Sequence, residues 1–270
     1  MSLNPQAAMM ADESMLRTLA AQVEAIWPQE QLLLARYALP ADARVLDVGC
    51  GTGEFSARIA RLYPQVRVSG VDVEARSLAT ARIRYNDVAA RLSFEEGDAF
   101  HLRFADGSFD LVVCRHVTQA VPGVEQLLGE LRRVTRSGGW VHVLSEDYAM
   151  LHMMSGPLDA DQFWQQGPIQ FTAKTGTDAR IGRKTWSSLK DLGLKNLRVD
   201  YVIVDTLRVK REVFAAIITA WRDGYSAALA EHSGMTMTQV RQHFDEIIAS
   251  ILNPDHYAVW FVPIISGQRP

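Results

Sequence analysis

The sequence predicts a doubly wound α/β fold, in which helices cover both faces of a mainly parallel sheet. Short, apolar, β-branched segments alternate with helical segments from about residue 44 to residue 147, and buried parallel strands have this nearly continuous apolar character. The chain has 270 residues, of which 48% are hydrophobic and 22% charged. It is therefore long and apolar enough to bury such a core without disulfide or metal staples.

Two helices are expected before the first strand, because Pro28 and Pro40 interrupt the helical spacing of the apolar residues. From Arg44 onward, strands and helices are expected to alternate, and the tripeptide 137–139, Ser-Gly-Gly, is expected to form a turn. The predicted N-terminal helices cover 13–27 and 30–39. The predicted strands cover 44–48, 66–73, 91–98, 109–117 and 140–147. One later helix is predicted after Gly53, and two more cover 75–89 and 124–135.

The alternation breaks after residue 147. Residues 148–183 have no clear period and are expected to form an inserted lid or substrate loop. A helix at 184–193 and a strand at 196–205 restore the pattern, and helical runs at 210–231 and 236–252 precede a last strand at 256–265. Roughly 50 residues between two strands is too long for a plain connection. This insertion, at about 207–255, is therefore expected to be a helical cap or the contact of a homodimer.

Composition narrows the class of partner. The formal net charge is -3, so no global positive field draws the chain toward nucleic acid or anionic lipid, and a small-molecule partner is favoured. The two cysteines, Cys50 and Cys114, are too few for a disulfide framework or a metal knuckle, and no metal site is predicted. The N-terminus lacks the pattern of a signal peptide, and no apolar stretch reaches the roughly 20 residues of a membrane helix. A cytoplasmic protein without a membrane partner is expected.

Three alternating glycines mark the first candidate site. Gly49, Gly51 and Gly53 follow the first strand and open a helix, where bare backbone lets a ligand approach. The next residue, Glu54, stands where a dinucleotide-binding turn needs a small residue, and its charge would repel a pyrophosphate. Asp47, at the mouth of the loop, favours a ligand with positive charge. The alternative is a tight strand-to-helix turn that binds nothing.

Two further acids follow the next two strands. Asp72 is placed to accept hydrogen bonds from both hydroxyls of a ribose. Asp98 could receive an exocyclic amine, and the backbone of Ala99 could meet a ring nitrogen. Taken alone, a single acid at a strand end is more often a helix cap, and the sequence Glu-Gly-Asp is only a turn.

These segments resemble a known family, the class I S-adenosylmethionine-dependent methyltransferases, and within it the small-molecule branch similar to ubiquinone and menaquinone biosynthesis methyltransferases. The matching stretches are VLDVGCGTG, VSGVDV, EGDAF, FADGSFDLVVCRHVTQAV and LRRVTRSGGWVHV. The resemblance covers about residues 40–147. It implies a Rossmann-like sheet of seven strands with a reversed last strand, and a cofactor that lies across the carboxyl ends of strands one to four.

The resemblance also implies roles for single residues. Asp47 would hold the methionine amine through water, Asp72 would take the ribose, and Arg115 with His116 would meet the methionine end. The loop would line the cofactor path with Gly49, Cys50, Gly51 and Gly53, and the adenine would meet Val73, Asp98 and Ala99. A sulfonium cation without phosphate suits a bare loop flanked by acids.

Candidates for catalysis follow the fourth and fifth strands. His116 could act as a general base, or it could pack at the strand end or simply contact the cofactor. Glu146, beside Asp147, could orient a substrate, help to bind a metal, or cap the chain. Tyr148, His152 and Trp164 are expected to face the substrate. The aromatic and methionine residues of the lid could equally be its packed underside.

The expected function is transfer of a methyl group from S-adenosylmethionine to a small-molecule metabolite by in-line displacement, with S-adenosylhomocysteine as the product. One alternative is a methyltransferase for RNA or protein, because residues 174–212 hold ten Lys or Arg against five Asp or Glu; few aromatic residues suited to base stacking lie there. The other is a non-catalytic protein that binds the cofactor. The expected organisation is residues 1–40 as N-terminal helices, 41–147 as the cofactor-binding α/β core, 148–183 as the lid, and 184–270 as the rest of the core with its helical insertion.

Overall fold

The fold is built on one sheet of eight strands. The computed structural model describes residues 13–154 and 156–270. The strands run in the order β3-β2-β1-β4-β5-β8-β6, and β7 also pairs with β8. Strands β1 to β5 are parallel, while β6 and β7 each pair antiparallel with β8, which is itself antiparallel to β5. The bounds are β1 Arg44–Val48, β2 Arg67–Asp72, β3 Leu92–Glu96, β4 Phe109–Arg115, β5 Thr135–Leu144, β6 Leu151–Met153, β7 Lys195–Asp205 and β8 Ala258–Gln268.

The predicted doubly wound sheet with a reversed last strand is confirmed, and β6 adds a short eighth strand. Neighbouring side chains of β1 point to opposite faces. Val45 packs with the helices on one face, in a core that includes Phe55, while Leu46 packs on the other face with Leu127. The helices beside the parallel strands are α3 Glu54–Leu62, α4 Ala75–Arg84, α5 Val124–Val134 and α8 Gly182–Asp191, with a short 3-10 turn at Asn86–Val88.

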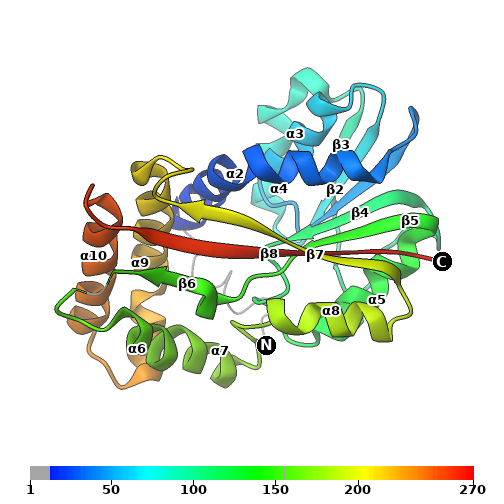
Figure 1. Ribbon diagram of the computed structural model, residues 1–270. Coiled ribbons are helices and arrows are strands. Elements are labelled where there is room, and N and C mark those ends of the chain that lie inside the picture. The colour runs from blue at the N-terminus through cyan, green and yellow to red at the C-terminus, as the bar shows by residue number, and fades with distance from the viewer. Residues whose placement is uncertain (1–12, 155) are drawn as a thin grey trace.

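A helical cap stands at the end of the molecule opposite the C-terminus (Figure 1). It is built on a third apolar core, which includes Phe163, Trp221, Phe244 and Trp260. Its elements are the 3-10 turn Tyr148–Met150, α6 Ala160–Trp164, a π-helical turn Gln165–Ile169, α7 Gln170–Thr175, α9 Arg211–Ser233 and α10 Met237–Leu252. The segment expected to be an inserted lid is therefore largely helical and packs against the C-terminal helices.

The N-terminal segment differs from the prediction. One helix, α2 Glu13–Leu34, continues through Pro28 and ends in a 3-10 turn at Ala35–Tyr37, where two helices were expected. A proline inside a helix costs about 3 kcal/mol, but the flanking residues are held by the rest of the protein. Trp27 and Glu30 are buried, and the side chain of Gln29 bonds both the N–H and the carbonyl of Ile203 on β7. These tertiary contacts offset the cost, so the prediction of a break was wrong.

The predicted turn at 137–139 is also wrong, because these residues lie within β5. The pairing register between β4 and β5 jumps between Phe109↔Thr135 and Leu111↔Trp140. The extra residues are taken up as a bulge, and a side chain at Gly139 would approach the Asp110 carbonyl to 2.9 Å.

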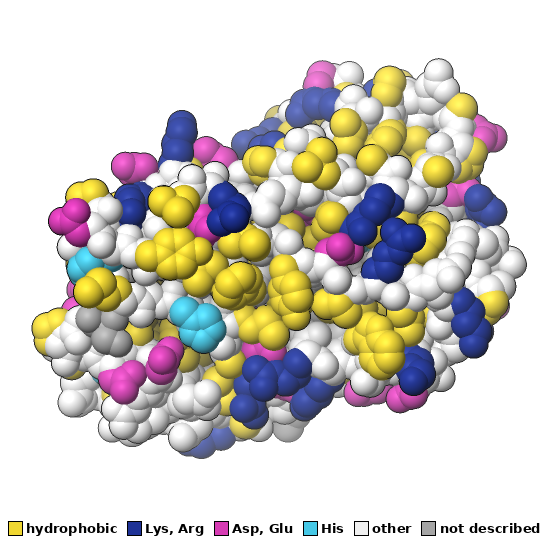
Figure 2. Space-filling model, viewed as in Figure 1, with side chains coloured by type: hydrophobic (Ala, Val, Ile, Leu, Met, Phe, Trp, Pro, Cys, Tyr) yellow, Lys and Arg dark blue, Asp and Glu magenta, His cyan; other side chains and the backbone are white. Residues whose placement is uncertain are grey.

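Hydrophobic side chains gather across the middle of the view in Figure 2, over β7 and β8. Val199 and Tyr201 of β7, and Tyr257 just before β8, are exposed. None of the helices described here is long and apolar enough to cross a bilayer.

Candidate active site

The glycine loop connects β1 to α3 and lies against the end of β2. The N–H groups of Gly49 and Cys50 both donate to the carbonyl of Val71, at 2.8 and 3.1 Å. Gly49, Gly51 and Gly53 all have positive φ, of 75°, 52° and 75°, which favours glycine. The loop is thus fixed by the sheet before any ligand binds.

The three glycines are not equivalent. A Cβ at Gly49 would stand 2.4 Å from Val117, and one at Gly53 2.4 Å from Phe94, so packing within the protein explains both. Among the described residues, a Cβ at Gly51 would meet only Leu19 of α2, at 3.1 Å. Gly51 is therefore the position where bare backbone faces away from the sheet, with α2 lying over it.

Asp72 ties the loop to β2. One carboxylate oxygen accepts from the N–H of Gly51 at 2.7 Å, and the other accepts from the N–H of Glu74 at 2.9 Å. Burial raises the pKa of Asp72, against these backbone hydrogen bonds, which lower it. The N–H of Val73 is a third backbone donor to this carboxylate, which leaves one of its four lone-pair sites for a further donor. The next residue, Val73, is half exposed beside it.

Asp98 and Ala99 follow β3 at the same edge of the sheet. The Asp98 carboxylate accepts from the N–H of Phe100 and contacts Nδ1 of His101, both at 2.9 Å. Burial tends to raise the pKa of Asp98, but the bonds from His101 and Phe100 outweigh it and hold the pKa below its usual value. Asp98 thus stays ionised, with Ala99 partly buried beside it.

Asp47, at the end of β1, is buried under the loop. Its carboxylate accepts from the hydroxyl of Ser56 at 2.5 Å. Burial raises the pKa of Asp47 to about 6, while the Ser56 hydrogen bond and the charge of Arg115 oppose the rise. The charge at the mouth of the loop therefore changes within reach of physiological pH.

Arg115, the last residue of β4, faces α2. Its Nε donates to Glu30 at 2.9 Å, and its guanidinium lies 4.2 Å from the centre of the Phe55 ring. The same Glu30 oxygen contacts Nε2 of His142 at 3.1 Å, and His142 Nδ1 contacts the Tyr37 hydroxyl at 2.6 Å. Nη2 of Arg115 is buried and has no hydrogen-bond partner within the described protein.

His116 begins the loop after β4, and its side chain contacts Glu146 rather than Glu30. Its φ of 57° is unusual for a residue other than glycine, and such backbone strain is concentrated at functional sites. Nδ1 lies 2.5 Å from Oε1 of Glu146, and both side chains are almost fully buried. The amide of Gln22, on α2, donates to the same oxygen at 3.3 Å. Among the described residues, neither Nε2 of His116 nor Oε2 of Glu146 has a hydrogen-bond partner.

This arrangement is that of a base held by a carboxylate. With a proton on Nδ1 shared with Glu146, Nε2 carries a lone pair and can take a proton from a substrate. Asp147 plays no part in it, because its carboxylate accepts from Arg183 at 2.6 and 3.0 Å. In the described part of the chain, no group of three or more His, Cys, Asp or Glu side chains is arranged to hold a metal ion.

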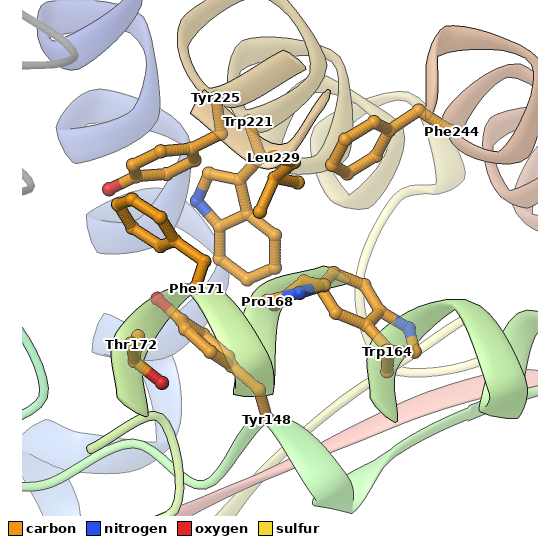
Figure 3. Close-up of a pocket in the computed structure, with 9 residues that line it drawn as sticks. All are labelled: Tyr148, Trp164, Pro168, Phe171, Thr172, Trp221, Tyr225, Leu229 and Phe244. Atoms are coloured by element: carbon orange, nitrogen blue, oxygen red, sulfur yellow. The ribbon is translucent and has the colours of Figure 1, made fainter. Parts of the chain in front are cut away.

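A small aromatic chamber lies within the cap. Its volume is about 20 Å³, and its lining residues are Tyr148, Trp164, Pro168, Phe171, Thr172, Trp221, Tyr225, Leu229 and Phe244. In Figure 3, Trp221, Tyr225 and Leu229 descend from α9 toward Tyr148 and Phe171. Burial and the Glu146 carboxylate raise the pKa of both Tyr148 and Tyr225.

The predicted substrate residues do not all lie in the same part of the structure. Tyr148 and Trp164 line the chamber. His152 is exposed on β6 and is not among the residues that line the chamber, so its place facing the substrate stays a prediction. Cys50 packs against the apolar core beside β2, and burial raises its thiol pKa well above the usual value.

Comparison with known proteins bears on the same residues. The family described as "Methyltransferase domain" matches residues 46–143, which run from β1 to β5 and include the glycine loop, Asp72, Asp98 and His116. Residues 46–143 are therefore similar to this methyltransferase family. The sequence resemblance to methyltransferases is thereby confirmed.

Relatives of this methyltransferase domain act on different substrates. The chain is 38% identical over 96 residues to demethylmenaquinone methyltransferase of Deinococcus radiodurans, covering 36% of this chain and 40% of that protein. It is 40% identical over 152 residues to trans-aconitate 2-methyltransferase of the same organism, covering 55% of this chain and 57% of that protein. The chain thus spans about two fifths to three fifths of the length of these two relatives.

Solved structures share the fold of the domain. Phosphoethanolamine N-methyltransferase 2 of Haemonchus contortus, in complex with S-adenosylhomocysteine, superposes with a TM-score of 0.59 at 20% identity, over 90% of this chain and 53% of that chain. The [4+2]-cyclase SpnF superposes with a TM-score of 0.53 at 20% identity, over 89% of this chain and 80% of that chain. Because one of these proteins is a cyclase, the shared fold does not fix the reaction.

Several residues of the site were missed from the sequence. Gln22, Glu30 and His142 gave no local signal, since they meet only through the fold. The chamber did have a signal in the sequence. Trp221, Tyr225 and Leu229 recur every four residues on α9, which places them on one face of a helix.

Proposed function

We propose that the chain binds S-adenosylmethionine across the glycine loop and transfers its methyl group to a small molecule. The observation that carries the proposal is the buried His116–Glu146 pair, whose Nε2 has no hydrogen-bond partner among the described residues, in a chain that matches a methyltransferase domain at residues 46–143. Complexes of the structural neighbour with S-adenosylmethionine and S-adenosylhomocysteine support the choice of cofactor.

The residues present fit such a ligand. Asp72 keeps a free lone pair for a ribose hydroxyl, Val73 and Ala99 offer apolar contact for adenine, and Asp98 accepts an amine. Gly51 leaves room for the cofactor beside the loop. The loop backbone from Gly49 to Gly53, including Cys50, would line the cofactor on that side. At the amino-acid end, Asp47 suits the ammonium and Nη2 of Arg115 the carboxylate, because the two side chains are close enough for the charge of Arg115 to lower the pKa of Asp47.

The cofactor, when bound, supplies a methyl group on a sulfonium sulfur. The protein aligns a nucleophile opposite that sulfur, and such alignment is worth about 7–11 kcal/mol. His116 Nε2 takes the proton that the nucleophile loses, and Glu146 stabilises the imidazolium that results. The leaving sulfur keeps the electron pair of the broken bond, so charge and atoms balance.

Transfer of a labelled methyl group tests the proposal. Protein incubated with radiolabelled S-adenosylmethionine and a fractionated cell extract should label the low-molecular-weight fraction. Label in RNA or protein alone would contradict it and would favour the basic segment 174–212 as the surface for a large substrate. Saturable binding of S-adenosylhomocysteine without any label would leave only a non-catalytic cofactor-binding protein.

Substitution of Asp72 by alanine is expected to weaken S-adenosylhomocysteine binding by about 1–3 kcal/mol, the usual range for lost charge-assisted hydrogen bonds. Isothermal titration calorimetry measures the change. Glu74→Ala is the matched control, since Glu74 lies two residues away and its side chain only caps α4. Equal affinity in Asp72→Ala and the native protein would remove the ribose assignment.

The affinity for S-adenosylhomocysteine is expected to depend on pH through Asp47. Because the Asp47 pKa is raised to about 6, its carboxylate is neutral below this pH and no longer attracts the ligand's ammonium. Affinity should therefore fall as the pH is lowered from 7.5 to 5. The Asp47→Asn variant should bind the ligand more weakly, and its affinity should change less over the same pH range. An identical pH profile in both proteins would show that another group is responsible.

A further inference from the structure

We propose that two copies of this chain associate by antiparallel pairing of their β7 strands, centred on Val199. Among the described strands, β7 pairs with β8 alone, along which it runs in Figure 1. Its other side is therefore a free edge of the sheet, and the unpaired N–H and C=O groups of such an edge favour pairing with another strand. The proposal concerns assembly and does not depend on the proposed methyl transfer.

The contacts of Ile203 show which backbone groups face this edge. The side-chain amide of Gln29 donates to the carbonyl of Ile203 at 2.8 Å and accepts from its N–H at 3.1 Å. In an antiparallel ladder, successive residues direct their backbone groups to opposite sides of the strand. The N–H and C=O groups of Val199 and Tyr201 therefore face away from β8, as those of Ile203 do, and are directed toward a partner strand.

The open part of the edge is bounded at both ends. At one end, the pairing of β7 with β8 has a bulge between Lys195 and Arg198, where Asn196 has a φ of 51°. At the other end, Gln29 occupies the edge at Ile203. Bulges and covered edges limit the pairing of strands. A partner strand thus has only a short stretch to pair with, and its centre must lie close to residues 198–200.

The charges of β7 select one centre within this stretch. An antiparallel pair of identical strands has two-fold symmetry, so each contact occurs twice. Centred on Val199, the pairing places Arg198 opposite Asp200 of the partner subunit. Centred on Arg198 it would oppose two arginines, and centred on Asp200 two aspartates. Opposite charges directly across a ladder are stabilising, whereas like charges are destabilising.

Both charged side chains can take a further partner. Asp200 is partly exposed and binds Arg36 at 2.6 Å through one carboxylate oxygen. Arg198 is exposed, and its guanidinium lies 5.7 Å from the centre of the Trp140 ring rather than in an ion pair with a described residue. Each arginine is therefore able to bind the aspartate that stands across the ladder.

The opposite face of β7 is apolar. Val199 and Tyr201 point to this face because successive side chains of a strand alternate, and both are exposed. The Tyr201 ring contacts Phe261 of β8, with ring centres 6.4 Å apart, within the region of hydrophobic side chains in Figure 2. Pairing at Val199 joins the two copies of this region and removes part of it from water.

Two charge reversals test the pairing. Sedimentation equilibrium should show that the native protein forms a dimer. Arg198→Asp and Asp200→Arg should each raise the dissociation constant of the dimer at least tenfold, because each places like charges across the ladder. Lys190→Asp, on exposed α8, has the same change of charge as Arg198→Asp and should leave the constant unchanged. A native protein that stays monomeric at every concentration would overturn the proposal.

Mixing the two variants tests the register. In an equimolar mixture, the aspartates of one chain face the arginines of the other, so the mixture should associate at least tenfold more tightly than either variant alone. Failure of the mixture to associate would show that Arg198 and Asp200 do not face each other, and would overturn the proposal. Thermal unfolding of each variant shows that it is folded.

Hydrogen exchange locates the contact. The N–H groups of Val199 and Tyr201 should exchange at least tenfold more slowly in the native dimer than in Arg198→Asp, because the partner strand protects them. A dimer in which exchange slows only in the helical insertion at about 207–255 would place the contact there and overturn the pairing through β7.

Discussion

Replacement of His116 by alanine is expected to lower kcat for methyl transfer by about 10²–10⁴-fold, the contribution of a positioned general base. Nδ1 of the imidazole is held by Glu146, and its Nε2 is buried with no hydrogen-bond partner among the described residues. Without it, the proton of the nucleophile has no acceptor held in place. Single-turnover methyl transfer measures the chemical step apart from binding.

The interpretation depends on two companion variants. Glu146→Gln should lower kcat in the same direction, because the amide no longer stabilises the imidazolium. His152→Ala, on exposed β6, should leave kcat unchanged. Affinity for S-adenosylhomocysteine should change far less than kcat in His116→Ala. A variant that loses affinity and keeps its rate would instead make His116 a cofactor contact.

Replacement of Glu30 by glutamine is expected to destabilise the fold by about 3–5 kcal/mol, the cost of removing one partner of a buried ion pair. Glu30 is fully buried, with Arg115 at 2.9 Å and His142 at 3.1 Å. Burial alone would raise the Glu30 pKa, but the Arg115 charge and the His142 hydrogen bond hold it below its usual value. The native carboxylate is therefore ionised, and glutamine would leave Arg115 buried without its counter-charge.

Chemical denaturation measures this effect. The matched control is Glu24→Gln, on the exposed side of the same helix, which should change the free energy of unfolding by less than about 0.5 kcal/mol. Because the Glu30 pKa is lowered in the folded protein, its contribution is present above the unfolded pKa and lost as the pH falls through the folded pKa. Similar stability of the two variants at pH 7 would mean that Asp47 alone compensates Arg115.

The parallel core was predictable because its signals are local. Residues 44–48 were expected as a strand and form β1 with the same bounds. The acids Asp47 and Asp72 end parallel strands, and Asp98 closely follows a third, so they had to meet at one edge of the sheet. That Glu146 reaches His116 was not predictable from spacing, although both follow neighbouring parallel strands, because the meeting depends on the backbone of His116 at positive φ.

The rest depended on contacts between distant segments. The sequence around Pro28 predicts the end of a helix. Helix α2 stays continuous because Gln29 and Glu30, next to Pro28, contact β4, β5 and β7. Likewise, the segment after residue 147 has no period of its own, since its aromatic residues pack against α9 and α10 rather than along one regular element. The cap could be located from sequence, but its shape and the chamber inside it could not.

The last strand, β8, has a consequence for how the protein comes apart. Its first residues pair with β6 in the cap, its last residues pair with β5 in the parallel core, and β7 runs beside most of its length. Neither the cap nor the core has a complete sheet without the other. Heating or denaturant should therefore melt both in one cooperative transition, and proteolytic fragments of either part should not persist as folded domains.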